Sequence, residues 1–178
     1  MKKILLFAFI GMTAALMNCS TDAKVCVKEV AATTIAAIPQ AQLILDIGKI
    51  KSYSASVPNV VNDPSGLSYK VTTLGTGDTP CLSSTIAVTY SGKVLQQNGT
   101  LAVSNFDASA TVVSFPLSNL ILGWQIAFPK FPAGTTATLY VPSGMAYGLR
   151  VQTGTNGQVT IPASSVLVFE VTLVAFAN

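Results

Sequence analysis

The side chains that most often act as catalysts are scarce in this sequence. Its 178 residues include no histidine, which excludes a Ser-His-Asp triad, a Cys-His dyad and any His-ligated metal site. Three cysteines are present, Cys19, Cys26 and Cys81, but no base lies beside Cys26 or Cys81 to activate it as a nucleophile. Whatever chemistry this protein performs is therefore done without imidazole.

Cys19 ends a segment that is typical of an export signal. Met1-Lys2-Lys3 is a short basic start, and Ile4 to Leu16 is an apolar run of thirteen residues. A bilayer needs about 20 residues, so the run fits a signal peptide better than a membrane span. Leu16-Met17-Asn18-Cys19 resembles a bacterial lipobox, in which the Cys becomes the lipidated first residue, although Asn18 departs from the usual Gly, Ala or Ser. Ordinary cleavage after Thr21-Asp22-Ala23 is the alternative, and both readings predict export.

Export changes what the remaining cysteines are expected to do. If Cys19 is lipidated or removed, Cys26 and Cys81 remain in an oxidising compartment, where a disulfide between them is expected. Such a bond would tie an N-terminal extension to the first strands of the folded domain. Two separate thiols are the alternative.

The composition indicates a packed domain rather than a nucleic-acid-binding or disordered chain. Half of the residues are hydrophobic and 10% are charged, against a typical ~25%, which predicts a β-rich fold. Loss of Lys2 and Lys3 with the leader leaves eight basic against seven acidic residues, and no basic cluster exists. A nucleic-acid partner is therefore not expected. An exported protein works without ATP, which favours a mechanism that needs no cofactor.

The periodicity of apolar residues predicts one helix ahead of a strand-rich domain. Residues 20–38 show no clear period, whereas Leu43, Ile47 and Ile50 recur at helical spacing and predict a helix from Pro39 to Tyr53. Ser54–Gly66 reads as a linker or loop, because Pro, Asn, Asp and Gly accumulate there.

From Leu67 onward, apolar and polar residues alternate as in strands. The alternating segments are Leu67–Val71, Ile86–Tyr90, Ala137–Val141 and Leu167–Leu173. Asn98-Gly99 is a hairpin turn signal, and Leu120–Phe128 is a short helix candidate that Pro129 ends. We therefore predict an α+β domain with an antiparallel sheet and one short helix packed on its face.

Six short motifs follow one another along this domain. They are Val88-Thr89-Tyr90-Ser91-Gly92, Phe106-Asp107-Ala108-Ser109, Phe115-Pro116-Leu117, Leu120-Ile121-Leu122-Gly123-Trp124, Ala146-Tyr147-Gly148, and Ile161-Pro162-Ala163-Ser164-Ser165 with the strand after it. In this order and spacing they resemble FKBP-type peptidyl-prolyl cis-trans isomerases. The resemblance implies a twisted antiparallel sheet wrapped around one short helix. It divides the chain into a lipoprotein signal peptide (1–18), an extension with one helix (19–65) and the isomerase domain (66–178), a layout similar to exported lipoproteins of Bacteroidetes.

The resemblance also implies an apolar pocket between the helix and the sheet. Trp124 would be its floor, the backbone N–H of Ile121 and the hydroxyl of Tyr147 would bind ligand carbonyls, and Asp107 would be the charge at its rim. The residues that match the family's site are Tyr90, Phe106, Asp107, Leu120, Ile121, Trp124, Tyr147, Ile161 and Phe169. Such a pocket binds tacrolimus-type macrolides. It would isomerise X–Pro bonds of proline-containing or partly unfolded exported polypeptides. The protein would be a monomer, anchored in the cell envelope by a lipid on Cys19.

Three departures from the family pattern leave other functions open. Five extra residues, Leu101–Asn105, precede Phe106 and could shift it together with Asp107. Val113 stands where an aromatic residue is common, and no basic residue follows Asp107 before Lys130. The alternatives to an isomerase are therefore a non-catalytic chaperone that binds proline segments and a structural envelope lipoprotein whose pocket is filled by the insertion.

Overall fold

The structure, a computed structural model, describes residues 25–178. The predicted leader and the predicted lipid-attachment residue Cys19 lie outside these residues. The strands are β1 (Val61–Asn62), β2 (Ser68–Thr73), β3 (Thr85–Leu95), β4 (Asp107–Pro116), β5 (Thr136–Val141), β6 (Gln152–Thr153), β7 (Val159–Ile161) and β8 (Val166–Ala177). The α-helices are α1 (Ala32–Ala36), α2 (Gln40–Ser54) and α3 (Leu122–Ala127), and the 3-10 helices are η1 (Leu117–Asn119), η2 (Phe128–Lys130) and η3 (Ser143–Met145).

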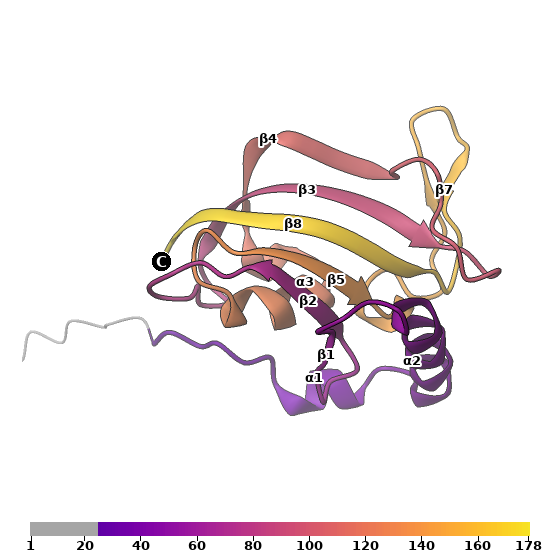
Figure 1. Cartoon of the computed structure of the whole chain (residues 1–178), viewed down its shortest axis with the longest axis horizontal. Coiled ribbons are helices and arrows are strands. Elements are labelled where there is room, and N and C mark those ends of the chain that lie inside the picture. The colour runs from indigo at the N-terminus through magenta and orange to yellow at the C-terminus, as the bar shows by residue number, and fades with distance from the viewer. Residues whose placement is uncertain (1–24) are drawn as a thin grey trace, which may run out of the picture.

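One antiparallel sheet of six strands forms the body of the domain. Its strand order is β1-β2-β5-β8-β3-β4, and β6 and β7 form a separate hairpin (Figure 1). Apolar residues of α3 and η2 pack on one face of this sheet, with Trp124, Ala127 and Phe128 buried against β3, β5 and β8. The predicted α+β fold, an antiparallel sheet around one short helix, is confirmed.

The four predicted strand segments correspond to β2, β3, β5 and β8. Strand β4 was not predicted, because it is an edge strand whose residues are exposed or half-buried and show no clear alternation. Strand β1 lies inside the predicted loop Ser54–Gly66. Helix α3 begins at Leu122, two residues later than predicted, because Leu120 and Ile121 have extended backbone conformations.

The N-terminal extension packs on the domain through α2. This helix covers Gln40–Ser54, close to the predicted Pro39–Tyr53, with Pro39 at its N-cap. Its residue Ile50 is fully buried in a second apolar cluster with Tyr140 and Val168, on the other side of the sheet from α3. A further short helix, α1, was not predicted and buries none of its residues. Over residues 25–178, no helix has the length and apolar character that crossing a membrane requires.

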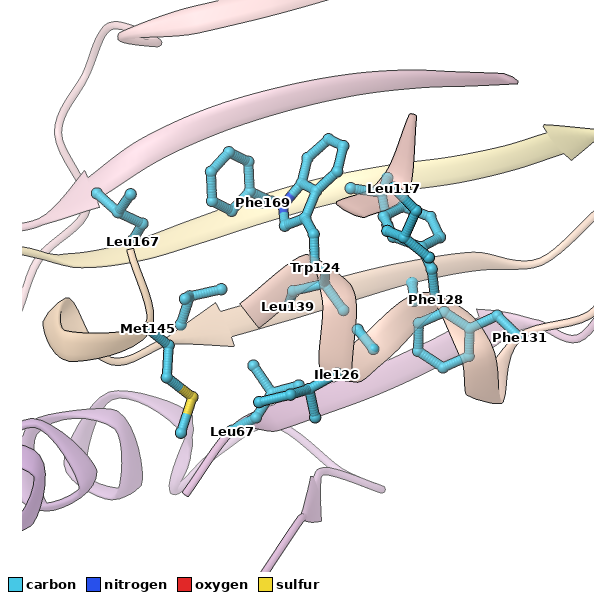
Figure 2. Close-up of a cluster of buried hydrophobic side chains, with 14 of the residues drawn as sticks. Leu67, Leu117, Trp124, Ile126, Phe128, Phe131, Leu139, Met145, Leu167 and Phe169 are labelled. Atoms are coloured by element: carbon cyan, nitrogen blue, oxygen red, sulfur yellow. The ribbon is translucent and has the colours of Figure 1, made fainter. Parts of the chain in front are cut away.

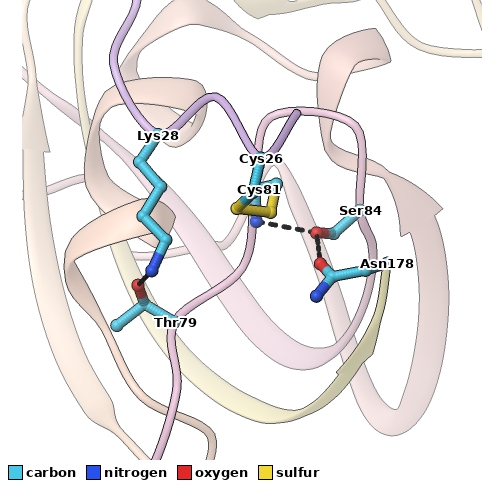
Figure 3. Close-up of a disulfide and its surroundings, with 6 residues drawn as sticks. All are labelled: Cys26, Lys28, Thr79, Cys81, Ser84 and Asn178. Atoms are coloured by element: carbon cyan, nitrogen blue, oxygen red, sulfur yellow. Dashed lines mark hydrogen bonds between the residues drawn. A yellow bond between two sulfur atoms is a disulfide. The ribbon is translucent and has the colours of Figure 1, made fainter. Parts of the chain in front are cut away.

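A disulfide fixes the start of the described chain to the domain. Cys26 and Cys81 are bonded, with their Cα atoms 5.2 Å apart, and Cys81 is buried (Figure 3). Beside the bond, the Leu82 N–H donates to the Val27 carbonyl, and the Lys28 ammonium donates to the Thr79 hydroxyl at 2.8 Å. The segment ahead of α1 is therefore held along the loop before β3.

We expect the disulfide to contribute a large share of the stability. The bonded residues are 55 positions apart, and the chain-entropy model gives ~4 kcal/mol for a loop of that length. Cys26→Ala should lower the free energy of unfolding in urea by up to this amount under oxidising conditions. With a reductant present, the variant and the wild type should unfold together. Two free thiols in denatured, unreduced protein from the exporting compartment would show that the bond does not form.

Candidate active site

Eight of the nine predicted site residues surround a cavity of about 190 Å³ on the α3 face of the sheet. Strands β3, β4 and β8 supply its walls, and the chain entering α3 supplies one side. The lining residues are Tyr90, Phe106, Asp107, Phe115, Leu120, Ile121, Trp124, Tyr147 and Phe169. Asp107 is the one charged residue among them, so the cavity is apolar with a single carboxylate.

Aromatic rings make edge-to-face contacts all around the cavity. The Trp124 ring lies 5.5 Å from Tyr90 and 5.3 Å from Phe169, at interplanar angles of 83° and 80°. Figure 2 shows the indole projecting from α3 toward the sheet beside Phe169. Phe106 meets Phe169 at 5.5 Å, and Phe115 meets Tyr90 at 6.4 Å. Edge-to-face pairs are favourable beyond the area they bury, so the rings hold one another in place.

A glycine in β3 makes one of these contacts possible. Gly92 is paired with Phe169 on β8 and with Asp107 on β4. A Cβ atom at position 92 would lie 2.6 Å from the Phe106 ring and 2.8 Å from the Phe169 ring. Because such contacts are too short, only glycine lets the two phenylalanine rings meet over this strand.

Besides the buried indole N–H of Trp124, two hydrogen-bond donors at the cavity have no partner within residues 25–178. The backbone N–H of Ile121, at the N-cap of α3, donates to no other group there, nor does the Tyr147 hydroxyl. The side-chain amide of Gln125 donates to the Leu120 carbonyl at 2.7 Å and so fixes the backbone that carries Ile121. Both donors are available to carbonyl oxygens of a bound ligand.

The N-terminal extension holds the loop that carries Tyr147. The fully buried carboxylate of Asp46 on α2 accepts hydrogen bonds from the backbone N–H and the hydroxyl of Ser143, at 2.8 and 2.5 Å. Ile38 packs so closely on Gly144 that a Cβ there would lie 2.5 Å from its side chain. Because η3 leads directly into Tyr147, the extension positions one wall of the cavity.

Burial and the rim carboxylate keep both tyrosines of the cavity protonated. Burial, followed by the hydrogen bond that the Tyr90 hydroxyl donates to Asp107 at 2.8 Å, raises the pKa of Tyr90 to about 12. Burial and then the charge of Asp107 raise the pKa of Tyr147. Both phenols therefore remain donors throughout the neutral range.

We expect stability to fall at high pH through Tyr90. A tyrosine of the unfolded chain titrates near pH 10, whereas Tyr90 in the fold titrates at about 12. Its contribution is therefore complete below about pH 10 and is lost as the pH rises toward 12. The free energy of unfolding, measured in urea, should fall between roughly pH 8 and pH 11 in the wild type. The fall should be about 1 kcal/mol smaller in Tyr90→Phe, once screening by solvent is taken into account. An equal fall in both proteins would contradict this account.

A family model for FKBP-type peptidyl-prolyl cis-trans isomerases matches residues 77–174. This chain belongs to that family. The outer membrane protein MIP of Legionella longbeachae is 35% identical over 124 residues, which cover 70% of this chain and 50% of that protein. The FKBP-type isomerase FkpA of Aeromonas hydrophila is 34% identical over 122 residues, 68% of this chain and 42% of that protein.

Solved structures agree with this assignment of the family. The crystal structure of a peptidyl-prolyl cis-trans isomerase from Pseudomonas syringae superposes with a TM-score of 0.62 at 28% identity, covering 78% of this chain and 96% of that one. The chain spans about half the length of these curated relatives.

The structure brings eight of the nine predicted site residues around one cavity. The ninth, Ile161 at the end of β7, is buried in the adjoining core and does not line the cavity. Sequence reasoning missed Phe115, whose ring lines the cavity and meets Tyr90 edge-to-face. Phe115 stood in one of the six motifs, and that was the signal available.

The insertion Leu101–Asn105 neither fills the cavity nor displaces its residues. Leu101 pairs with Leu95 across the turn at Asn98-Gly99, and the chain then loops outward. The Phe106 N–H donates to the Gly92 carbonyl at 2.9 Å, which returns Phe106 and Asp107 to the cavity wall.

Proposed function

We propose that this chain is a peptidyl-prolyl cis-trans isomerase acting on X–Pro bonds of partly unfolded, exported polypeptides. The observation that carries the proposal is the aromatic cavity of about 190 Å³ over Trp124. It is smaller than the roughly 300–1,000 Å³ pockets that enclose drug-sized ligands, and its size favours a single ring such as that of proline. Membership of the family supports the same activity.

The cavity favours the transition state of amide rotation. An X–Pro bond isomerises over a barrier of ~18–20 kcal/mol, which takes ~10–100 s without a catalyst at 25 °C. Twisting the bond removes amide resonance and makes the group less polar, so apolar walls stabilise the twisted form better than water does. Each tenfold acceleration requires ~1.4 kcal/mol of such differential binding. No proton transfer is needed, in keeping with a chain that lacks histidine.

Polar groups at the rim hold the peptide while its bond rotates. The Ile121 N–H and the Tyr147 hydroxyl donate to substrate carbonyls, so the proline ring stays over Trp124. Asp107 is held by the Tyr90 hydroxyl at 2.8 Å, which orients the carboxylate although no basic residue of the described range 25–178 pairs with it. These contacts position the substrate without taking part in any bond change.

A kinetic measurement tests the proposal. Cis-trans exchange of an uncharged Xaa-Pro tetrapeptide is followed by NMR with and without catalytic amounts of the protein. At least tenfold faster exchange is expected. Binding of the peptide without faster exchange would favour the non-catalytic chaperone, and neither binding nor exchange would favour the structural lipoprotein.

We also propose that the protein is anchored in the cell envelope by a lipid on Cys19, with residues 1–18 removed, 19–65 as an extension and 66–178 as the isomerase domain. The leader pattern supports this, as does the relative named an outer membrane protein. The disulfide fixes Cys26 to the domain, and the seven positions from Cys19 to Cys26 span at most about 25 Å. The anchor would therefore hold a monomeric domain close to the membrane surface.

A further inference from the structure

A second, larger depression lies next to the aromatic cavity. It measures about 740 Å³ and is bounded on one side by the end of β3 with the insertion loop, and on the other by β7 and the chain after it. In Figure 1 the label β7 marks the hairpin beside the turn that joins β3 to β4. We call this depression the flanking groove.

The flanking groove adjoins the aromatic cavity at one side chain. Phe106 lines both, with Phe169 against it on the cavity side. A polypeptide whose proline lies over Trp124 therefore has the groove directly beside it, past the Phe106 ring. The insertion that precedes Phe106 contributes Ala102, Ser104 and Asn105 to the groove wall.

The lining of the flanking groove carries no charged side chain. Amides, hydroxyls and apolar side chains line it, and none of its thirteen lining residues is acidic or basic. The side chains of Gln97, Ser104 and Asn105 make no hydrogen bond to any residue in the range 25–178, so they are available to a ligand. A charged segment would lose hydration there without gaining a partner, whereas peptide groups and apolar side chains would be accommodated.

The groove wall also offers a strand edge. Strand β7 pairs with β6 alone in a two-stranded sheet, so within residues 25–178 its other edge has no strand partner. Val159 of β7 lines the groove and remains 57% exposed. Val103 in the insertion and Leu149 in the chain ahead of β6 are exposed as well, at 95% and 79%, although neither lines the groove. An open strand edge with exposed apolar side chains is the surface that binds an extended peptide through its main chain.

We propose that the flanking groove binds, in extended form, the uncharged part of a polypeptide that adjoins the X–Pro bond in the aromatic cavity. This inference rests on the proposed function and adds a substrate class to it: segments with Ser, Thr, Asn, Gln and aliphatic residues beside proline. Main-chain binding makes the groove tolerant of sequence, as a protein that acts on many unfolded chains requires.

Peptide length and charge test the proposal. Dissociation constants are measured, by the fluorescence of the single tryptophan, Trp124, for an Xaa-Pro tetrapeptide and for twelve-residue peptides with the same core. Uncharged flanks should tighten binding at least tenfold, and flanks of Asp and Lys should not. Two substitutions from opposite walls, Val159→Lys and Ser104→Arg, should each remove the gain from uncharged flanks.

A matched control is offered by Val112 on β4, which is 54% exposed and lies outside the groove. Val112→Lys should retain the full gain in affinity. Equal affinity for short and long peptides in a protein that isomerises the tetrapeptide would overturn the groove and leave the proposed function standing. A gain that both groove variants retain would overturn it too. Loss of tetrapeptide isomerisation together with a charge-sensitive gain would overturn the proposed function and support the groove.

Discussion

Trp124→Ala is expected to reduce catalysed isomerisation at least about tenfold and to abolish binding of a tacrolimus-type macrolide. The indole is the floor of the cavity and contacts Tyr90, Phe128 and Phe169 edge-to-face. Its removal leaves space in which the substrate ring finds no apolar surface, so the differential binding of ~1.4 kcal/mol or more is lost. Truncating a buried tryptophan also costs ~3–5 kcal/mol of stability, so activity is compared at a temperature where circular dichroism shows the variant folded.

The variant Trp124→Phe distinguishes the role of the ring as cavity floor from its role in the stability of the fold. The indole Nε1 is buried without a hydrogen-bond partner in the described part of the chain, so a phenyl ring loses no such bond. This variant should keep a flat apolar floor and most of the activity. A folded Trp124→Ala protein that binds the macrolide at full strength would falsify the assignment of the site.

The second large effect is expected at Asp46, which does not line the cavity. Its carboxylate is fully buried and accepts from the Ser143 N–H, the Ser143 hydroxyl and the Gln42 amide. Asp46→Ala leaves the Ser143 donors buried without a partner and should lower the free energy of unfolding by ~2–4 kcal/mol. In the folded protein, the loosened η3 loop should also lower kcat/KM through Tyr147.

Three comparisons test this account of Asp46. Asp46→Asn keeps an oxygen that can accept from Ser143 and should restore most of both losses. Asp78→Ala removes an exposed carboxylate and should change stability by less than about 0.5 kcal/mol. If Asp46 acts through Tyr147, the effects of Asp46→Ala and Tyr147→Phe on kcat/KM are not additive. Additive losses would show that Asp46 supports the fold alone.

The predictable parts of the fold are the elements in which buried and exposed positions alternate at a regular interval along the chain. Strand β3 and the second half of β8 alternate because one face meets the core, whereas the first four residues of β8 are buried on both faces of the sheet. Strand β4 lies at the edge with both faces largely exposed, so its sequence carries no such period. Helix α1 has no fully buried residue, which leaves its Ala- and Thr-rich sequence equally uninformative.

The site shows the same division between local patterns and long-range contacts. Residues that belong to short motifs, such as Trp124 and Tyr147, were identified from the chain alone. Asp46 was not, because its partner Ser143 lies 97 positions away and a lone Asp on a helix resembles a solvated residue. The groove beside the cavity likewise depends on where the insertion and the β6–β7 hairpin meet in space.

Titration of catalysed exchange with a tacrolimus-type macrolide tests the central claim most directly. Cis-trans exchange of a tetrapeptide and the fluorescence of Trp124 are recorded in the same samples as the ligand is added. If the cavity over Trp124 is the catalytic site, the rate should fall to the uncatalysed value and both signals should share one midpoint at one ligand per chain. Catalysis that persists after the Trp124 signal has saturated would place the activity elsewhere and contradict the account.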